Sequence, residues 1–154
     1  MGRCGRRSHG FSLVELVIVV IIIAVLAAVA IPRFGRAGQG ASAAALSADL
    51  AQLRKAIEIY QAEHGGVYPA DPTNQLTLFT DNNGNISPTK DTTFYLGPYL
   101  QRIPPLPVGA NVGNTGISAA DGAGVGWIYD PASGNITADT TTEQDGTGKL
   151  YSAY

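Results

Sequence analysis

A single acidic side chain, Glu15, stands at the start of a long apolar stretch. Every residue from 16 to 31 is apolar, and extending the stretch back to Phe11 adds only Ser12 and Glu15 as polar residues. An acidic residue near the centre of a membrane costs about 2.5 to 3.5 kcal/mol, and somewhat less toward an interface. Glu15 is therefore the first candidate for a functional residue, and its chemistry is electrostatic pairing with a positive charge.

A cut between Gly10 and Phe11 would supply that positive charge. The new α-amino group would lie four residues before Glu15, about one helical turn away. The amine can come from the same chain or, in a helical assembly with an axial stagger, from a neighbouring copy. In the second case the pair also sets the register between copies, since a buried charge without its partner is penalised by several kcal/mol. The alternative is that the Glu15 side chain extends to the membrane interface without a partner.

The sequence lacks the common catalytic motifs. It contains no Gly-x-Ser-x-Gly elbow, no phosphate-binding Gly-Lys-Ser/Thr loop and no His-Glu-x-x-His metal motif. Of its two histidines, His9 lies in the basic N-terminal segment and His64 has a position typical of a helix end rather than of a ligand. We therefore expect that the protein is not an enzyme and has no catalytic residues.

The element that positions Glu15 is expected to be a helix long enough to cross a membrane. At about 1.5 Å per residue, residues 11–31 span roughly 30 Å, which matches the hydrocarbon core of a bilayer. Arginines flank the stretch on both sides, namely Arg3, Arg6 and Arg7 before it and Arg33 and Arg36 after it. This distribution favours an N-terminus in the cytoplasm and a distal region outside it. The alternatives are a secretory signal cut at the A-x-A-like residues 28–30, and an anchor that is retained intact and leaves Glu15 unexplained.

The residues around the expected cut resemble a known processing signal. The stretch Gly10-Phe11-Ser12-Leu13-Val14-Glu15-Leu16, followed by the Val/Ile/Ala run and Pro32, resembles the class III signal of type IV pilins and type II secretion pseudopilins. The specific features are a short basic leader that ends in glycine, a phenylalanine after it and a glutamate at the fifth mature position. The resemblance implies cleavage after Gly10 by a prepilin peptidase and N-methylation of Phe11. It also implies that Glu15 pairs with the Phe11 amine of an adjacent subunit and that the helix is kinked at Pro32.

Beyond the apolar stretch the helix is expected to bend and then to continue. Pro32 removes a helix hydrogen bond, and the glycines at 35, 38 and 40 each cost about 1 kcal/mol relative to alanine. From residue 41 onward, apolar side chains recur at helical spacing, which predicts an amphipathic helix that covers a sheet. These side chains are Leu46, Leu50, Leu53, Ile57 and Tyr60. The sequence His64-Gly65-Gly66 predicts the end of this helix, because glycine suits a left-handed C-cap.

The distal region, residues 67–154, combines turns with short strands. The sequence at 64–69, His-Gly-Gly-Val-Tyr-Pro, is similar to the helix-to-loop junction of the major pseudopilins. Residues 94–107 form an apolar, proline-rich segment that is expected to pack irregularly beneath the helix. Residues 126–129 and 135–138, joined by a turn at 130–134, predict a β-hairpin with Trp127 in the core. The tail, residues 139–154, is expected to form a final edge strand or to fray.

Two acidic segments raise the question of calcium. Residues 81–85, Asp-Asn-Asn-Gly-Asn, favour a simple turn because the glycine is not at the sixth position, as an EF-hand loop requires. Asp139, Glu143 and Asp145 offer carboxylates in the tail, where the resemblance to major pseudopilins implies a calcium loop, but the usual spacing of that family is not reproduced. We therefore expect no cofactor and no metal site, with calcium as the alternative.

The composition argues against direct binding of nucleic acid. The formal net charge is -2, charged residues make up 14% of the chain and aromatic residues 8%, so neither a basic surface nor a stacking platform is indicated. The single cysteine, Cys4, lies before the expected cut. Adhesive pilins often close their distal region with a disulfide, so the lack of cysteine in the mature chain favours a pseudopilin.

Together these features predict an α+β fold, in which a long N-terminal α-helix packs on a small antiparallel β-sheet. The expected parts are a basic leader (1–10), a transmembrane and polymerisation helix (11–31), a kinked amphipathic continuation of the helix (32–66) and a periplasmic loop and sheet region (67–154). The expected function is that of a structural subunit of a type IV pilus-like filament, as a pseudopilin of a type II secretion system. The alternatives are a surface type IV pilin for adhesion, motility or DNA uptake, and a membrane-anchored binding module that does not polymerise.

The expected surroundings follow from that function. The protein would cross the inner membrane once, with its C-terminal region in the periplasm, and would be extruded in filament form. Its partners would be identical or related pilin subunits, the prepilin peptidase, the inner-membrane assembly platform and the membrane itself.

Overall fold

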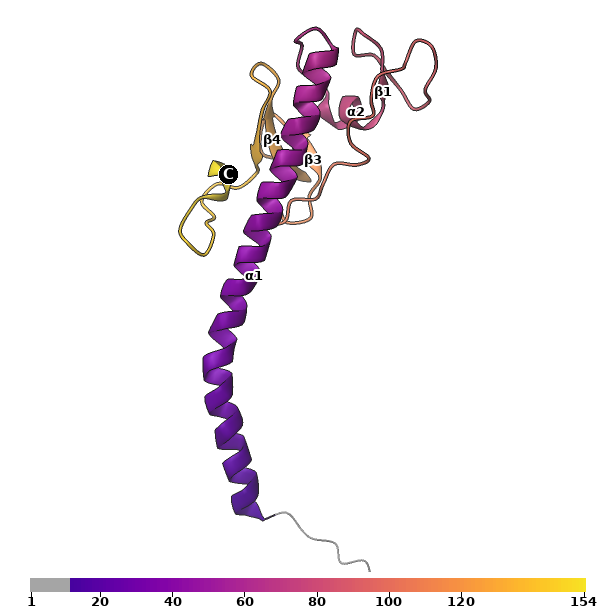
Figure 1. Cartoon of the computed structure of the whole chain (residues 1–154). Coiled ribbons are helices and arrows are strands. Elements are labelled where there is room, and N and C mark those ends of the chain that lie inside the picture. The colour runs from indigo at the N-terminus through magenta and orange to yellow at the C-terminus, as the bar shows by residue number, and fades with distance from the viewer. Residues whose placement is uncertain (1–11) are drawn as a thin grey trace, which may run out of the picture. The chain divides into compact units, whose positions relative to one another are not determined.

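One long helix, α1, begins the fold and runs over Leu13–Glu63 (Figure 1). The computed structural model describes residues 12–154, without the side chains of residues 29–37 and 39 in this helix. The chain divides into two units, residues 1–38 and 39–154, and each is described on its own. The α+β class predicted from the sequence is confirmed, because a short helix and two small sheets follow α1.

The C-terminal half of α1 buries the predicted apolar face. The five side chains of that face are each 2% exposed or less, namely Leu46, Leu50, Leu53, Ile57 and Tyr60. Their spacing of three and four residues places them on one side of the helix. They form one hydrophobic core with side chains from the sheet and from the proline-rich segment, all within residues 43–151.

The predicted end of α1 is also confirmed. Gly65 and Gly66 have φ values of 66° and 93°, in the left-handed region that side chains disfavour. The Gly66 N–H donates to the carbonyl oxygen of Gln61 at 2.8 Å, and this bond closes the last turn of the helix.

A short helix and a two-stranded ribbon follow. Helix α2 (Pro72–Thr77) starts with a proline and is capped by Asp71, whose side chain accepts a hydrogen bond from the Asn74 N–H. Strands β1 (Phe79–Thr80) and β2 (Ile86–Ser87) pair antiparallel. Between them, Asp81 Oδ1 accepts from the backbone N–H groups of Asn83 and Asn85 at 2.8 and 2.9 Å, so residues 81–85 form the simple turn that was predicted.

The larger sheet has the order β3-β4-β5. Strands β4 (Val125–Asp130) and β5 (Asn135–Ala138) form the predicted hairpin. Strand β3 (Gly116–Ser118) pairs parallel to β4, so this sheet is mixed rather than antiparallel as predicted. Glycine permits the close approach, because a Cβ on Gly126 would lie 2.4 Å from the Asn114 carbonyl oxygen.

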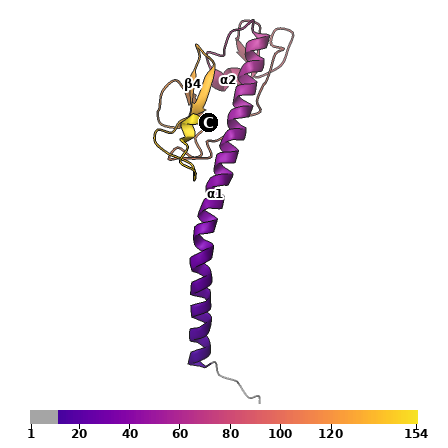
Figure 2. The same cartoon turned by 60° about the vertical axis from the view of Figure 1, so that its left-hand side comes forward.

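Trp127 anchors this sheet in the core. It is fully buried, and its Nε1–H donates to the carbonyl oxygen of Pro104 at 2.9 Å. The predicted packing of the proline-rich segment is confirmed as well, since Leu100, Ile103 and Leu106 of that segment belong to the same core. Figure 2 shows α2 and β4 beside the C-terminal half of α1.

The tail neither forms an edge strand nor frays, so the prediction for residues 139–154 is wrong. Gln144 and Leu150 form one isolated bridge around a turn, and a 3-10 helix, η1 (Tyr151–Ala153), follows. The Asp145 carboxylate organises the turn, because its Oδ1 accepts from the backbone N–H groups of Thr147 and Lys149 at 2.7 and 3.0 Å. The sequence missed this arrangement because the acceptor is a side chain rather than a second strand.

Candidate functional site

The N-terminal part of α1 exposes a continuous apolar surface. Every large apolar side chain from position 13 to position 26 is at least 44% exposed. A surface of this kind on one helix is unusual for a protein that stays monomeric in water, and it marks a site of contact with another protein or with a membrane. The surface is therefore the first candidate for a functional site.

Glu15 is the one ionisable residue on this surface. It lies in the first turn of α1, where its side chain is exposed and where the Leu16 N–H donates to the Ser12 carbonyl oxygen at 3.2 Å. A negative charge is favourable at a helix N-terminus, because the unpaired N–H groups give that end a partial positive charge. Among the described residues the only salt bridge joins Lys55 to Glu58, at 3.7 Å, so Glu15 has no ion pair within this part of the chain.

Several predicted site residues lie outside the described part of the chain. Gly10 and Phe11, predicted for cleavage and methylation, are among them, as is the leader over residues 1–10. The predicted pair between Glu15 and a Phe11 amine therefore stays a prediction. Helix α1 includes Pro32 as part of one element, but the side chain there is not described and the predicted kink also stays a prediction.

The predicted span over residues 11–31 includes Phe11 and the side chains at 29–31, which are not described. Within the residues that the structure does describe, no helix has both the length and the hydropathy needed to cross a membrane.

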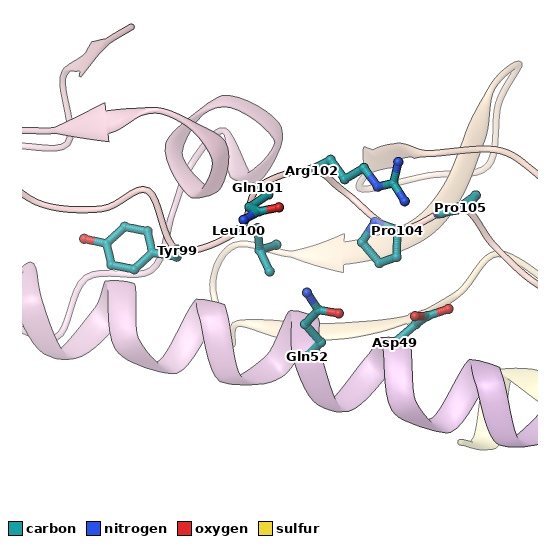
Figure 3. A pocket seen from close by; sticks show the side chains of 8 residues that line it. All are labelled: Asp49, Gln52, Tyr99, Leu100, Gln101, Arg102, Pro104 and Pro105. Carbon is teal, nitrogen blue, oxygen red and sulfur yellow. The ribbon is translucent and has the colours of Figure 1, made fainter. Parts of the chain in front are cut away.

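A pocket of about 510 Å³ lies between α1 and residues 99–105. Figure 3 shows Asp49 and Gln52 projecting from α1 toward this segment, which carries Arg102. Burial raises the pKa of the Asp49 carboxyl, and no salt bridge joins it to Arg102. The lining contains no histidine, serine or cysteine, and its one carboxylate is that of Asp49.

A third group of side chains surrounds Asp139, directly after β5. Asp139 is 5% exposed, and its Oδ2 accepts a hydrogen bond from Asn111 Nδ2 at 2.9 Å. Burial raises the pKa of the Asp139 carboxyl, and the nearby carboxylates of Asp121 and Glu143 raise it further. Glu143 itself accepts from the Ala110 N–H at 2.6 Å.

The expectation of no metal site, with calcium as the alternative, stays a prediction. No group of three or more histidine, cysteine, aspartate or glutamate side chains among the described residues could hold a metal ion. The Asp145 carboxylate, predicted as a possible ligand, accepts hydrogen bonds from its own turn and from the Tyr154 hydroxyl.

Arg54 is a structural residue that the sequence pattern missed. It is not among the apolar side chains that define the packed face of α1, but its guanidinium donates to the carbonyl oxygens of Tyr154 and Ile136 at 3.1 and 3.2 Å. The partners lie 100 and 82 residues away in the chain, so spacing within the helix gave no signal for this contact.

The comparisons with known proteins bear on the N-terminal surface. Residues 5–31 match the family model of the prokaryotic N-terminal methylation motif. Comparison with curated proteins and with solved structures finds no match. The motif covers Gly10, Phe11 and Glu15, and it implies processing by a prepilin peptidase and assembly of a structural subunit into filaments. The chain carries at residues 5–31 the class III signal peptide of type IV pilins and pseudopilins, which supports a type IV pilin-like or pseudopilin subunit.

Proposed function

We propose that the protein is a pseudopilin, a structural subunit of the pilus-like filament of a type II secretion system. The observation that carries this proposal is the methylation motif at residues 5–31, with its glutamate at the start of an exposed apolar helix. The precursor is cleaved between Gly10 and Phe11, Phe11 is N-methylated, and the new N-terminus then enters the filament.

The physical basis of assembly is the burial of the apolar helix surface together with the pairing of its one charge. Transfer of the apolar side chains at 13–26 from water or lipid into a well-packed helix bundle lowers the free energy of the system. Glu15 opposes this burial unless a cation accompanies it. The Phe11 amine of an adjacent subunit supplies that cation, so that only the correct axial stagger neutralises the carboxylate.

Before assembly the same helix anchors the protein in the inner membrane. Arginines at both ends of the apolar stretch favour a cytoplasmic leader and a periplasmic C-terminal region. The prepilin peptidase and the inner-membrane assembly platform then act on the anchored subunit. The absence of cysteine after Cys4 supports a secretion filament over an adhesive pilus, which is often closed by a disulfide.

Substitution of Glu15 tests the proposal. Glu15→Leu and Glu15→Gln should each still insert into the membrane, because both remove a charge from an apolar segment. Filament formation should fall by about tenfold or more, because the charge pair that sets the register is lost. The measurement is the amount of filament seen by electron microscopy, set against the subunit content of the membrane fraction.

Glu58→Gln is the matched control for this experiment. Glu58 is an exposed helix glutamate whose salt bridge with Lys55 lies on the surface, so its loss should change little. Normal filaments with either Glu15 variant would contradict the proposed assembly and favour a plain membrane tether. Sequencing of the mature N-terminus is a second test, since any first residue other than Phe11 contradicts the proposed processing.

A further inference from the structure

The end of α1 holds a histidine whose two ring nitrogens both face carbonyl oxygens. His64 is 7% exposed. Its Nδ1 lies 2.8 Å from the carbonyl oxygen of Tyr60, and its Nε2 lies 2.9 Å from the carbonyl oxygen of Asp81. A carbonyl oxygen accepts hydrogen bonds and cannot donate one, so each nitrogen bonds to it only when that nitrogen carries a proton.

A neutral imidazole cannot satisfy both contacts. It has one N–H and one nitrogen lone pair, so one of the two contacts would set a lone pair against a carbonyl oxygen at hydrogen-bond distance. The doubly protonated ring donates to both oxygens. Its positive charge also suits the C-terminal end of a helix, where unpaired carbonyl groups give a partial negative charge.

Two aromatic rings and two carboxylates surround His64. The ring stacks on Tyr60 with centroids 3.8 Å apart and planes 8° from parallel, and the edge of Tyr99 approaches with centroids 6.4 Å apart. Burial raises the pKa of both phenols, so Tyr60 and Tyr99 stay neutral. The nearby charged groups are Asp81, from the turn, and Glu63, which accepts a hydrogen bond from the Tyr99 hydroxyl at 2.7 Å.

The Asp81 carboxylate is itself held in its charged form. Its pKa is lowered by the hydrogen bond from the Asn85 side chain and by the backbone N–H groups of Asn85 and Asn83. The turn thus offers His64 both a carbonyl acceptor and a nearby negative charge.

We propose that His64 is doubly protonated in the folded protein and acts as a proton-dependent latch between the end of α1 and the turn at residues 81–85. Loss of one proton leaves only one of the two contacts, and the turn is then held less tightly. The contribution of His64 to stability is therefore larger when the ring carries both protons than when it carries one. The latch is independent of the proposed function, because it rests only on contacts within residues 39–154.

The protonation state can be observed directly. The full chain with His9→Gln, in detergent micelles, leaves His64 as the only histidine for 15N labelling. At about pH 7 a free imidazole, with a pKa of about 6.5, is mostly neutral. We expect two ring nitrogens with similar 15N shifts, each coupled to a proton. One protonated and one unprotonated nitrogen at this pH would overturn the proposal.

A second measurement tests the latch itself and requires no substitution of His64. The turn of Asp145 provides an internal reference. The side chains of Asp81 and Asp145 each accept hydrogen bonds from the backbone N–H groups two and four residues later. His64 is bonded to the Asp81 turn and not to the Asp145 turn. Amide hydrogen exchange is compared with the rates of an unfolded chain between about pH 5.5 and about pH 8.5. Protection of residues 83–85 should fall by half or more relative to residues 147–149, and an unchanged ratio would overturn the proposal.

His64→Phe separates the packing of the ring from its hydrogen bonds. Phenylalanine keeps a ring on Tyr60 but removes both donors. The difference in melting temperature between the unsubstituted protein and this variant should shrink by half or more over the same pH range. A difference that is equal at both ends of the range would show that His64 acts only through packing, and would contradict the latch.

Discussion

Asp139 is a carboxylate that the fold buries without a cation beside it. It is 5% exposed, its hydrogen-bond donor is the neutral amide of Asn111, and burial together with the carboxylates of Asp121 and Glu143 raises its pKa. The folded protein therefore binds a proton at Asp139 more tightly than the unfolded chain does. It follows that ionised Asp139 destabilises the fold at neutral pH, and that this cost declines as the pH falls below the folded-state pKa and is gone below the pKa of the unfolded chain.

Asp139→Asn should accordingly raise the melting temperature by a few degrees at neutral pH. The amide oxygen can still accept from Asn111, and the charge is gone. The gain should vanish in acid, where the carboxyl of the unsubstituted protein is protonated. Thermal unfolding at neutral and acidic pH checks this, with Asp139→Ala as the control that loses the acceptor and should gain less.

The same experiment tests the expectation that no metal binds. Calcium should leave the melting temperature unchanged in the unsubstituted protein and in Asp139→Asn. A rise on calcium addition in the former but not in the latter would mean that a cation neutralises Asp139, contrary to the expectation from the sequence.

Glu15 and Asp139 differ in how visible they are in the sequence. Glu15 stands out because its sequence neighbours are apolar, so its unusual environment can be predicted from adjacent residues. The environment of Asp139 depends on Asn111 and Asp121, which are remote in the chain. The same reason hides the contacts of Arg54 and the bond of His64 to the Asp81 carbonyl oxygen, because these partners are fixed only by the tertiary fold.

At the scale of the elements, α1 was predictable because its signals are local and repeated. Apolar spacing gave the packed face, and Gly65 and Gly66 gave the end. Strand β3 was not predictable, because it has three residues and pairs parallel to β4, close to glycines at 116 and 126. Short strands carry too little side-chain pattern to fix their direction.

The glycines in α1 lead to a prediction for this element. A Cβ at Gly38 or at Gly40 would meet no atom of the described residues within 4 Å, so packing against them does not require glycine there. Gly38→Ala and Gly40→Ala should each stabilise the helix by about 1 kcal/mol. Hydrogen exchange of the amides around these positions should slow in both variants, and Ala44→Gly, on an exposed helix position, should have the opposite effect.

Unchanged exchange in the alanine variants would contradict the view that these glycines weaken the helix. Filament yield, measured alongside, separates two further reasons for glycine. If the alanine variants assemble normally, filament formation requires neither a weak helix segment at these positions nor a close approach by a neighbouring subunit. If assembly fails although exchange slows, the filament requires glycine at these positions.

At the scale of the whole molecule, stability and assembly are assigned to different parts of the chain. The hydrophobic core uses residues 43–151, while the exposed apolar side chains at 13–26 contribute nothing to it. The unit formed by residues 39–154 therefore contains all of the core that the described residues form. In the sequence, the apolar stretch and the amphipathic face of the helix likewise follow different patterns.

A chain of residues 39–154 should thus fold alone and stay out of filaments. Its C-terminal helix half, both sheets and the contacts of Arg54 with Ile136 and Tyr154 are all retained, so cooperative unfolding within a few degrees of the full chain is expected. It should be soluble without detergent, since the apolar surface at 13–26 is removed. Full-length Glu15→Leu is the companion variant, because it keeps the apolar surface and loses only the charge. If the shortened chain is unfolded, the N-terminal half of α1 must support the core; if it joins filaments, assembly does not depend on the N-terminal helix. The first result would contradict the separate folding of residues 39–154, and the second would remove the physical basis for treating residues 5–31 as the assembly element of this subunit.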